Sequence, residues 1–371
     1  MSNIKIRKQD KTIKKKSLAA LILACSLLIG GCSKDRDPKN SAPSGTPVII
    51  STGTSETETP VTSGSGPIHI RPDVQPNGDI VILMTGDMHC GFDKNFSFGG
   101  LYEIRYQLEL KGDTVMLVDD GDAIQGEPVA YLTRGEVMIG LMNNMDYAVA
   151  VPGEHEFDYG MDRFFELMNK ANFDYICCNF TKDGKQVLKP YVIKEVLGKK
   201  IAFVGVTTPK ALTLAPSESF QDENGRYVYG FMQDDTGEAI CNAVQSAVDK
   251  ARGEGAQYVV LMGHIGNEAV SAPWIYSTIT SKLKGVDIYL DSYSHDSNIE
   301  EYIDGEGKKL SRVPAGTKLN GVGWVRIPKD GGEITCGYYS YINEMIATDL
   351  FDIENPMTRR VKEVKKENGM E

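Results

Sequence analysis

Polar side chains that can bind metal follow several apolar runs of the sequence. They are Asp87 and His89 after VILMT, Asp122 after VMLVD, Glu154, His155 and Asp158 after AVAV, His264 at the end of VVLMGH, and Tyr293 and His295 after IYLDS. Four of the five histidines of the chain stand at these places. A lone histidine is more often a hydrogen-bonded core residue, so the prediction depends on the whole set. Imidazole and carboxylate groups gathered at one point could form a two-metal hydrolytic site.

The elements that would gather these residues are strands and helices in alternation. Apolar runs rich in Val and Ile lie at 79–87, 114–122, 147–153, 174–180, 200–209, 258–264 and 286–292. Between them, Met161, Phe164, Phe165 and Met168 have the spacing of a helix face, and Ile240, Val244, Ala247 and Ala251 repeat it. Continuous apolar strands between amphipathic helices predict a sheet covered on both faces. In such α/β folds ligands bind beyond the carboxyl ends of the strands, which is where the polar residues stand.

Composition limits the partners of the chain. The 371 residues are 41% hydrophobic, enough for a sizeable core, and the net charge is −11 although the N-terminus is strongly basic. An acidic body excludes nucleic-acid polymers and anionic membrane surfaces as partners. A small phosphate compound would need a local positive centre, which a bound metal supplies. The sequence has no G-x-x-x-x-G-K loop and no G-x-S-x-G elbow, so it does not support an ATPase or a serine esterase.

The N-terminus has the features of an export signal. Lysines and one arginine precede a 13-residue apolar run, Ser17 to Ile29, which is shorter than the roughly 20 residues of a membrane-spanning helix. The small residues before Cys32 resemble the lipobox of bacterial lipoproteins. This implies a signal peptide at 1–31, lipid on Cys32 and attachment to the outer face of the cell membrane. An uncleaved signal anchor is the alternative. Residues 32–77, rich in Ser, Thr, Pro and Gly, predict a flexible tether.

Several segments, taken in order, resemble a known family. They are Asp87-Met88-His89, Gly99-Gly100, DDGDAIQGEPVAYLTRGE, GEHEFDYG, TTP at 207–209, GH at 263–264, DSYSH at 291–295 and PAGTK at 314–318. Together they resemble the catalytic half of bacterial 5'-nucleotidases, in the calcineurin-like metallophosphoesterase superfamily. The resemblance covers about residues 79–330. It implies a catalytic domain at 78–345 with a four-layer α/β/β/α sandwich and a metal site at the carboxyl ends of the strands.

The resemblance also implies roles for individual residues. One metal would be held by Asp87, His89 and His295, and a second by the residues at 154, 264 and 293, with Asp122 bridging the two. The ions would be two divalent metals, or one of them ferric, with Mn, Fe and Zn as the main candidates. A water or hydroxide between them would attack phosphorus in line. His155, oriented by Asp158, would stabilise the phosphoryl charge or help the leaving oxygen depart.

Two positions depart from the family pattern. Position 154 is normally Asn and position 293 is normally His, but this chain has Glu154 and Tyr293. Three alternatives remain open. Both residues bind metal and give an oxygen-rich site that favours Mn²⁺ or Fe³⁺, or the second site binds weakly, or it is lost.

A third departure concerns the C-terminus. Family members usually continue into a domain that selects the nucleotide, whereas residues 346–371 here form a charged tail that includes ENPMTRRVKEVKKENGME and predicts a frayed helix. We therefore expect relaxed specificity, or a separate chain that supplies the missing domain.

Two functions fit these observations. The first is a surface-anchored, metal-dependent phosphohydrolase that acts on nucleotides or related phosphate esters. The second is a tethered module that binds phosphate compounds through a degraded metal site without turnover. His155 and Asp158 favour the enzyme, because both are useful only for chemistry.

Overall fold

The computed structural model describes residues 67–68, 72–343 and 354–370. The predicted signal peptide at 1–31, Cys32 and nearly all of the tether lie outside these described residues. The predicted boundary at 345/346 lies outside them too. Among the residues that are described, no helix combines the length and the apolar character needed to cross a membrane.

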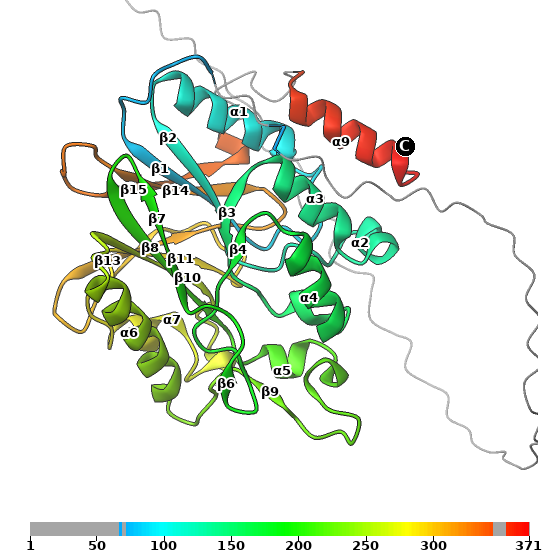
Figure 1. Ribbon diagram of the computed structural model, residues 1–371, viewed down its shortest axis with the longest axis vertical. Helices are drawn as coiled ribbons and strands as arrows, with labels where there is room; N and C mark the ends of the chain where they lie inside the picture. Colours follow the sequence, from blue (N-terminus) through cyan, green and yellow to red (C-terminus); the bar gives the residue numbers. More distant parts are fainter. Residues whose placement is uncertain (1–66, 69–71, 344–353, 371) are drawn as a thin grey trace, which may run out of the picture. The chain divides into compact units, whose positions relative to one another are not determined.

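The first of two large sheets carries the N-terminal strands (Figure 1). Its order is β15-β14-β1-β2-β3-β4. The strands are β1 (Ile80–Thr85), β2 (Thr114–Asp119), β3 (Tyr147–Ala150), β4 (Asp174–Tyr175), β14 (Gly321–Ile327) and β15 (Thr335–Ser340). β1 to β4 are parallel, while β14 pairs antiparallel with β1 and β15 antiparallel with β14. The carboxyl ends of the four parallel strands therefore lie along one edge.

The second large sheet has the order β12-β13-β11-β10-β8-β7. Its strands are β7 (Tyr191–Val196), β8 (Lys199–Thr207), β10 (Tyr258–His264), β11 (Ile288–Ser292), β12 (Glu300–Ile303) and β13 (Lys309–Pro314). β8, β10, β11 and β13 are parallel, and β7 and β12 are antiparallel edge strands. A small third sheet contains β6 (Lys185–Gln186), β5 (Thr181–Lys182) and β9 (Tyr229–Gly230).

The side chains of the two large sheets alternate between an inner and an outer core. Ile80, Ile82 and Met84 of β1 belong to a buried cluster that also contains Phe203 and Met262 of the second sheet. Val81 and Leu83 point the other way, into the helices that cover the first sheet. The sheets thus pack face to face, and their strands are apolar on both sides because each face is covered.

Helices cover the outer face of each large sheet. The first sheet packs against α1 (Ser97–Leu110), α3 (Glu136–Asn144), α4 (Met161–Lys170) and α9 (Pro356–Glu367), and the second against α6 (Glu238–Gly253) and α7 (Tyr276–Thr280). Shorter elements are α2 (Pro128–Thr133), α5 (Ala211–Leu214), η1 (His155–Phe157), η2 (Ser217–Phe220) and η3 (Ala269–Ser271). The predicted four-layer α/β/β/α sandwich is confirmed. A single sheet with helices on both faces, which the apolar runs alone predicted, is wrong, because a second sheet covers a strand as completely as a helix does.

The C-terminal segment is more ordered than its charge predicts. Asn355 caps α9 by accepting a hydrogen bond from the Thr358 N–H at 2.8 Å. Met357, Val361 and Val364 form a narrow apolar stripe that is buried in the core on the α1 side. We expected a frayed helix, but three apolar residues at helical spacing suffice to pack it although lysine, arginine and glutamate dominate the segment.

Candidate metal centre

Five strand ends from the two large sheets bring the candidate residues together. β1, β2 and β3 precede the loops that hold Asp87, Asp122 and Glu154, while His264 ends β10 and His295 follows β11. The site therefore lies where the carboxyl edges of the two sheets meet. No single sheet supplies it, and this explains why residues far apart in the sequence are neighbours.

The first group of ligand atoms contains Asp87, His89 and His295. Nε2 of His295 lies 3.4 Å from Oδ1 of Asp87 and 3.1 Å from Nε2 of His89, and all three ligand atoms lie within 4.8 Å of one another. Oδ1 of Asp87 is buried and has no hydrogen-bond partner. Two imidazole nitrogens and a carboxylate oxygen that converge in this way are a suitable donor set for a transition metal.

The second group contains Asp122, Glu154 and His264, all buried. Nε2 of His264 lies 3.4 Å from Oδ2 of Asp122 and 2.9 Å from Oε2 of Glu154. The 2.9 Å contact is not in hydrogen-bond geometry, and both of its atoms lack a hydrogen-bond partner. Buried polar atoms without a partner are uncommon in native proteins, and a cation would satisfy them. The residues therefore fit a second metal ion.

Asp122 lies between the two groups. Its carboxylate belongs to one cluster with Asp87 and His264, and to another with His89 and His155. Burial alone would raise the pKa of Asp122, but the nearby His264 lowers it well below the ordinary value. Asp122 therefore stays ionised and is placed to be shared by two cations.

The ring of His264 is held in a defined orientation. Its Nδ1 lies 2.6 Å from the backbone oxygen of Asp120 and 2.7 Å from Oγ of Ser292. A carbonyl oxygen can only accept, so Nδ1 carries the hydrogen and Nε2 of the neutral ring has a free lone pair facing Asp122 and Glu154. This is the arrangement found around metal-binding histidines.

Tyr293 borders the second group. Its ring makes an edge contact with the His264 ring, with centroids 5.6 Å apart, and its hydroxyl lies 3.4 Å from Oγ of Ser271 in η3. The hydroxyl of Tyr293 thus already has a hydrogen-bond partner, in contrast to Oε2 of Glu154. Of the two residues that depart from the family pattern, Glu154 has the geometry that better fits a metal ligand.

His155 and Asp158 form a hydrogen-bonded pair next to Asp122. Nδ1 of His155 lies 2.8 Å from Oδ2 of Asp158, and Nε2 lies 4.0 Å from Oδ2 of Asp122. Burial alone would lower the pKa of His155, but the hydrogen bond to Asp158 and the charge of Asp122 raise it to about 9. His155 is therefore protonated at neutral pH and can act as an acid.

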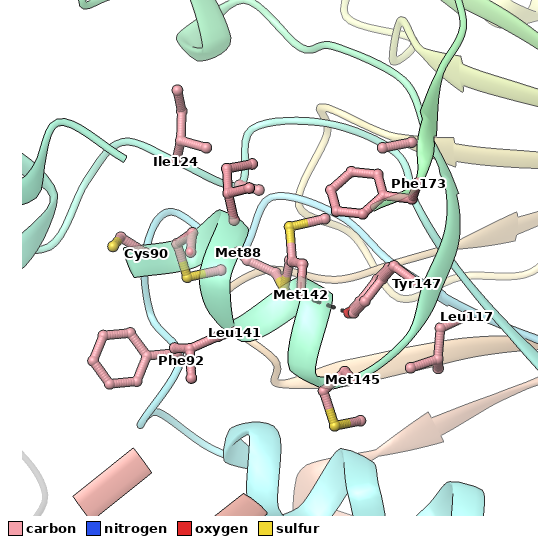
Figure 2. Packing of buried hydrophobic residues seen from close by; sticks show 14 of the residues in the cluster. Met88, Cys90, Phe92, Leu117, Ile124, Leu141, Met142, Met145, Tyr147 and Phe173 are labelled. Carbon is pink, nitrogen blue, oxygen red and sulfur yellow. Dashed lines mark hydrogen bonds between the residues drawn. The ribbon is translucent and has the colours of Figure 1, made fainter. Parts of the chain in front are cut away.

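The loop backbone at the site is unusual. Five of the predicted residues have positive φ although they are not glycine, namely Asp87, His89, Asp122, Tyr293 and His295. Such conformations cost about 1–3 kcal/mol each and persist only where neighbouring contacts hold them. In the first loop Met88, Cys90 and Phe92 alternate with the polar residues, and their side chains are buried beside α3 (Figure 2). This core packing anchors the loop.

Glycine is required where two of the loops approach each other. Gly121 has φ +92°, and a Cβ there would lie 2.5 Å from the backbone nitrogen of Gly153 and 2.9 Å from Nδ1 of His264. The absence of a side chain lets the Asp122 loop approach the Glu154 loop and the His264 ring.

One important residue of the site had no predicted role. The buried carboxylate of Glu156 accepts hydrogen bonds from the N–H groups of Asp122 at 2.7 Å, Ala123 at 2.8 Å and Gly153 at 2.6 Å. Burial and the charge of Asp122 raise the pKa of Glu156 to about 7. Glu156 thus joins the loops of Asp122 and Glu154. The sequence offered only its place in GEHEFDYG, because a carboxylate that binds backbone N–H groups has no signature of its own.

Stacked sheets with helices outside, and a histidine and carboxylate cluster at the meeting strand ends, define the class of metallophosphoesterases. The sequence profile described as calcineurin-like phosphoesterase matches residues 80–296. The chain belongs to this family.

Comparison with curated and solved proteins agrees with this assignment. The chain is 24% identical over 265 residues to the trifunctional nucleotide phosphoesterase protein YfkN of Bacillus subtilis, which covers 62% of this chain and 17% of that protein. It is 30% identical over 149 residues to a 5'-nucleotidase of Vibrio parahaemolyticus, covering 38% of this chain and 27% of the relative.

The solved structures show the same fold. The structure of YfkN from Bacillus subtilis superposes with a TM-score of 0.62 at 19% identity, covering 78% of this chain and 98% of that one. A 5'-nucleotidase structure from Staphylococcus aureus gives 0.60 at 18% identity, covering 78% and 58%. The chain spans well under half the length of the curated relatives that it matches, from 17% of YfkN to 38% of a bovine 5'-nucleotidase.

Proposed function

We propose that this chain is a metal-dependent phosphohydrolase that acts on nucleotides or related phosphate esters. The observation that carries the proposal is the cluster of buried ligand atoms without partners, Oδ1 of Asp87, Oε2 of Glu154 and Nε2 of His264, beside a hydrogen-bonded His155–Asp158 pair. The names of relatives, 5'-nucleotidase and 2',3'-cyclic-nucleotide 2'-phosphodiesterase/3'-nucleotidase, support nucleotides as the substrate class.

The donor sets support two metal ions. Asp87, His89 and His295 would hold the first, Glu154 and His264 the second with Tyr293 at its edge, and Asp122 would be shared. Bound ions of this kind activate water and neutralise the charge of the phosphoryl oxygens. The added carboxylate of Glu154 makes the second set richer in oxygen, which favours Mn²⁺ or ferric iron over Zn²⁺.

The remaining chemistry falls to side chains of the chain itself. His155 points its Nε2 toward the shared carboxylate of Asp122, so a phosphate held there would meet a protonated imidazole. His155 would stabilise charge on the phosphoryl group or give its proton to the leaving oxygen. Asp158 keeps the ring oriented and favours its protonated form.

A binding module without turnover is the second candidate. It is favoured by Glu154 and Tyr293, which stand where the family pattern has Asn and His, and by the hydrogen bond of the Tyr293 hydroxyl to Ser271. In this alternative the second group does not fill, and the chain binds phosphate compounds through the first metal alone.

We also propose that the protein is exported and anchored by lipid on Cys32. The basic N-terminus, the short apolar run and the small residues before Cys32 support this. Cys32→Ala should then move the protein from the membrane fraction to a soluble or unprocessed pool. A mutant that stays in the membrane and is processed at the same site would contradict the anchor. A separate chain that supplies a nucleotide-selecting domain is a further proposal, and co-purification from the native membrane would test it.

The decisive experiment combines metal analysis with a phosphate-release assay on the purified protein. Nucleoside 5'- and 3'-monophosphates, 2',3'-cyclic nucleotides and simple phosphate monoesters would be tested with Mn²⁺, Zn²⁺ or a chelator. We expect release that needs metal and is abolished in Asp87→Ala. Full metal occupancy without release from any of these compounds would favour the binding module.

A further inference from the structure

The segment from the end of β11 to Asp296 carries residues of both metal groups. Oγ of Ser292 lies 2.7 Å from Nδ1 of His264, and Nε2 of His295 lies 3.4 Å from Oδ1 of Asp87. Tyr293 and His295 have φ of +82° and +54° without being glycine. A short turn with two such residues needs strong contacts outside itself to keep this shape.

Arg312 of β13 contacts both ends of this segment. Its side chain is only 1% exposed. At the start of the segment, Nε and Nη2 lie 3.0 and 2.9 Å from Oδ2 of Asp291. At its end, Nη1 and Nη2 lie 2.9 and 2.8 Å from Oδ1 and Oδ2 of Asp296, which is a two-pronged contact. One guanidinium therefore spans the whole turn that holds Tyr293 and His295.

The other surroundings of Arg312 fix the guanidinium in turn. Nη1 lies 3.3 Å from the backbone oxygen of Asn298, and the guanidinium carbon lies 4.5 Å from the centre of the Tyr276 ring. The free oxygen of Asp291 accepts a hydrogen bond from the Tyr289 hydroxyl at 2.6 Å. The guanidinium is thus held on several sides, as a rigid bridge requires.

We propose that Arg312 is a positioning residue of the metal centre. By joining Asp291 to Asp296 it holds His295 toward Asp87, and through Ser292 it holds the ring of His264. This inference rests on the metal centre of the proposed function, but metal affinity tests it and hydrolysis does not. Arg312 touches none of the ligand atoms, so its effect would act only through the turn.

Lysine cannot replace arginine in this role. Its ammonium is a single point charge, whereas the planar guanidinium offers donors in a fixed fork to two carboxylates at once. Arg312→Lys therefore keeps the charge and removes the bridge. Residues that orient metal ligands typically change metal affinity by about 10–100-fold when they are altered.

The chain offers a matched control in Arg326 of β14. Its Nη1 and Nη2 lie 2.9 Å from the two oxygens of Asp113, and Nη1 lies 3.0 Å from Asp79. Asp79 and Asp113 directly precede β1 and β2, at the ends opposite to the metal loops. Arg326→Lys removes a bridge of the same chemistry away from the site.

The test is Mn²⁺ titration by calorimetry on the full chain after removal of metal with a chelator. We expect Arg312→Lys to weaken Mn²⁺ binding by about 10–100-fold and Arg326→Lys to change it by less than about threefold. Thermal unfolding of both variants shows how much of any change is general destabilisation. An Mn²⁺ affinity of Arg312→Lys equal to that of Arg326→Lys would overturn the proposal.

Asp296→Asn provides a second variant in case Arg312→Lys does not fold. Asp296 is 28% exposed and its replacement keeps the shape of the side chain, so folding should survive. We expect weaker Mn²⁺ binding by about tenfold, and an unchanged affinity would overturn the bridge. A parent chain that binds no Mn²⁺ would overturn both the metal centre and the role of Arg312. A parent that binds Mn²⁺ without hydrolysing any ester would overturn only the proposed activity.

Discussion

Oε2 of Glu154 lies 2.9 Å from Nε2 of His264, and neither atom has a hydrogen-bond partner. Because the carbonyl of Asp120 takes the hydrogen on Nδ1 of His264, the two facing atoms both present lone pairs when the ring is neutral. Two buried lone pairs at this distance repel each other unless a proton or a cation lies between them. Burial alone would lower the pKa of His264, but Asp122 and Glu154 raise it well above the ordinary value, which shows the excess negative charge of the site.

Mn²⁺ should therefore stabilise the folded chain. A ligand that binds only the folded state adds about 2.7 kcal/mol at a concentration 100 times its dissociation constant. Thermal unfolding with and without Mn²⁺ measures this gain. Glu154→Gln keeps the shape of the side chain and removes one charge, so its gain should be smaller. No shift of the midpoint in the parent at millimolar Mn²⁺ would contradict a metal centre.

Glu156→Gln should destabilise the fold by about 1–3 kcal/mol, the cost of leaving a buried donor unpaired. The three N–H groups of Asp122, Ala123 and Gly153 all point at the two oxygens of Glu156, and an amide would turn one NH₂ group against them. Urea unfolding of the metal-free chain measures the change. Glu166→Gln on α4, where the carboxylate is half exposed, serves as control and should stay within about 0.5 kcal/mol. Equal stability of the two variants would remove Glu156 from the framework of the site.

The sequence predicted the parallel strands and the residues at their ends for a physical reason. β1, β2, β8, β10 and β11 are apolar on both faces, and the polar residue that ends each strand marks the point where the chain reaches solvent. Helix periodicity likewise predicted α4 and α6, where Ile240, Val244, Ala247 and Ala251 are all buried.

What the sequence did not predict depends on contacts between distant segments. Nothing in β14 or β15 shows that they extend the first sheet beside β1, because antiparallel pairing depends on register and not on local pattern. The same holds for Glu156 and Arg312, which act on backbone and carboxylates of other segments. Single acidic or basic residues look the same in sequence whether they face solvent or join two loops.

His155→Asn should lower phosphate release by about 10²–10⁴-fold, the usual contribution of a positioned acid or base. The metal content should stay that of the parent, because the carboxylate of Asp122 is held by the backbone N–H of residue 155 and not by its ring. Rate and metal content measured on the same preparation check this. A loss below about threefold at full metal content would exclude His155 from the chemistry.

Asp158→Asn should move the alkaline limb of the rate profile to lower pH. In the folded chain the pKa of His155 is raised from 6.5 to about 9, and the hydrogen bond to Asp158 is the largest of the causes that raise it. A raised pKa keeps the imidazole protonated to higher pH, so an acid role for His155 gives activity that falls only in the alkaline range. Without the carboxylate the pKa falls toward its ordinary value, and the rate should decline earlier. Asp162→Asn, an exposed change on α4, is the control, and identical profiles for both variants would argue against the pairing.

The double change Glu154→Asn with Tyr293→His tests the second metal group, where the chain departs from its family. The carboxylate of Glu154 adds a fixed charge beside His264, so we expect the parent to prefer Mn²⁺ or ferric iron. The double variant restores an amide and an imidazole and should shift preference toward Zn²⁺ or Co²⁺. Changing one position alone leaves a mixed donor set, so the pair is the informative variant. Metal analysis after equilibration with each ion, together with rates, measures the shift.

Asp87→Ala is the control for this comparison, because it removes a ligand of the first group and should abolish activity in the parent and in the double variant alike. The alternative of a lost second site makes a different forecast. The parent would then hold about one metal per chain and the double variant about two, with activity that appears only after the change. Two bound ions in the parent under saturating Mn²⁺ would support Glu154 as a direct ligand. A single ion under the same conditions would contradict it and favour the binding module, since the lone pairs of Glu154 and His264 would then be satisfied by a proton.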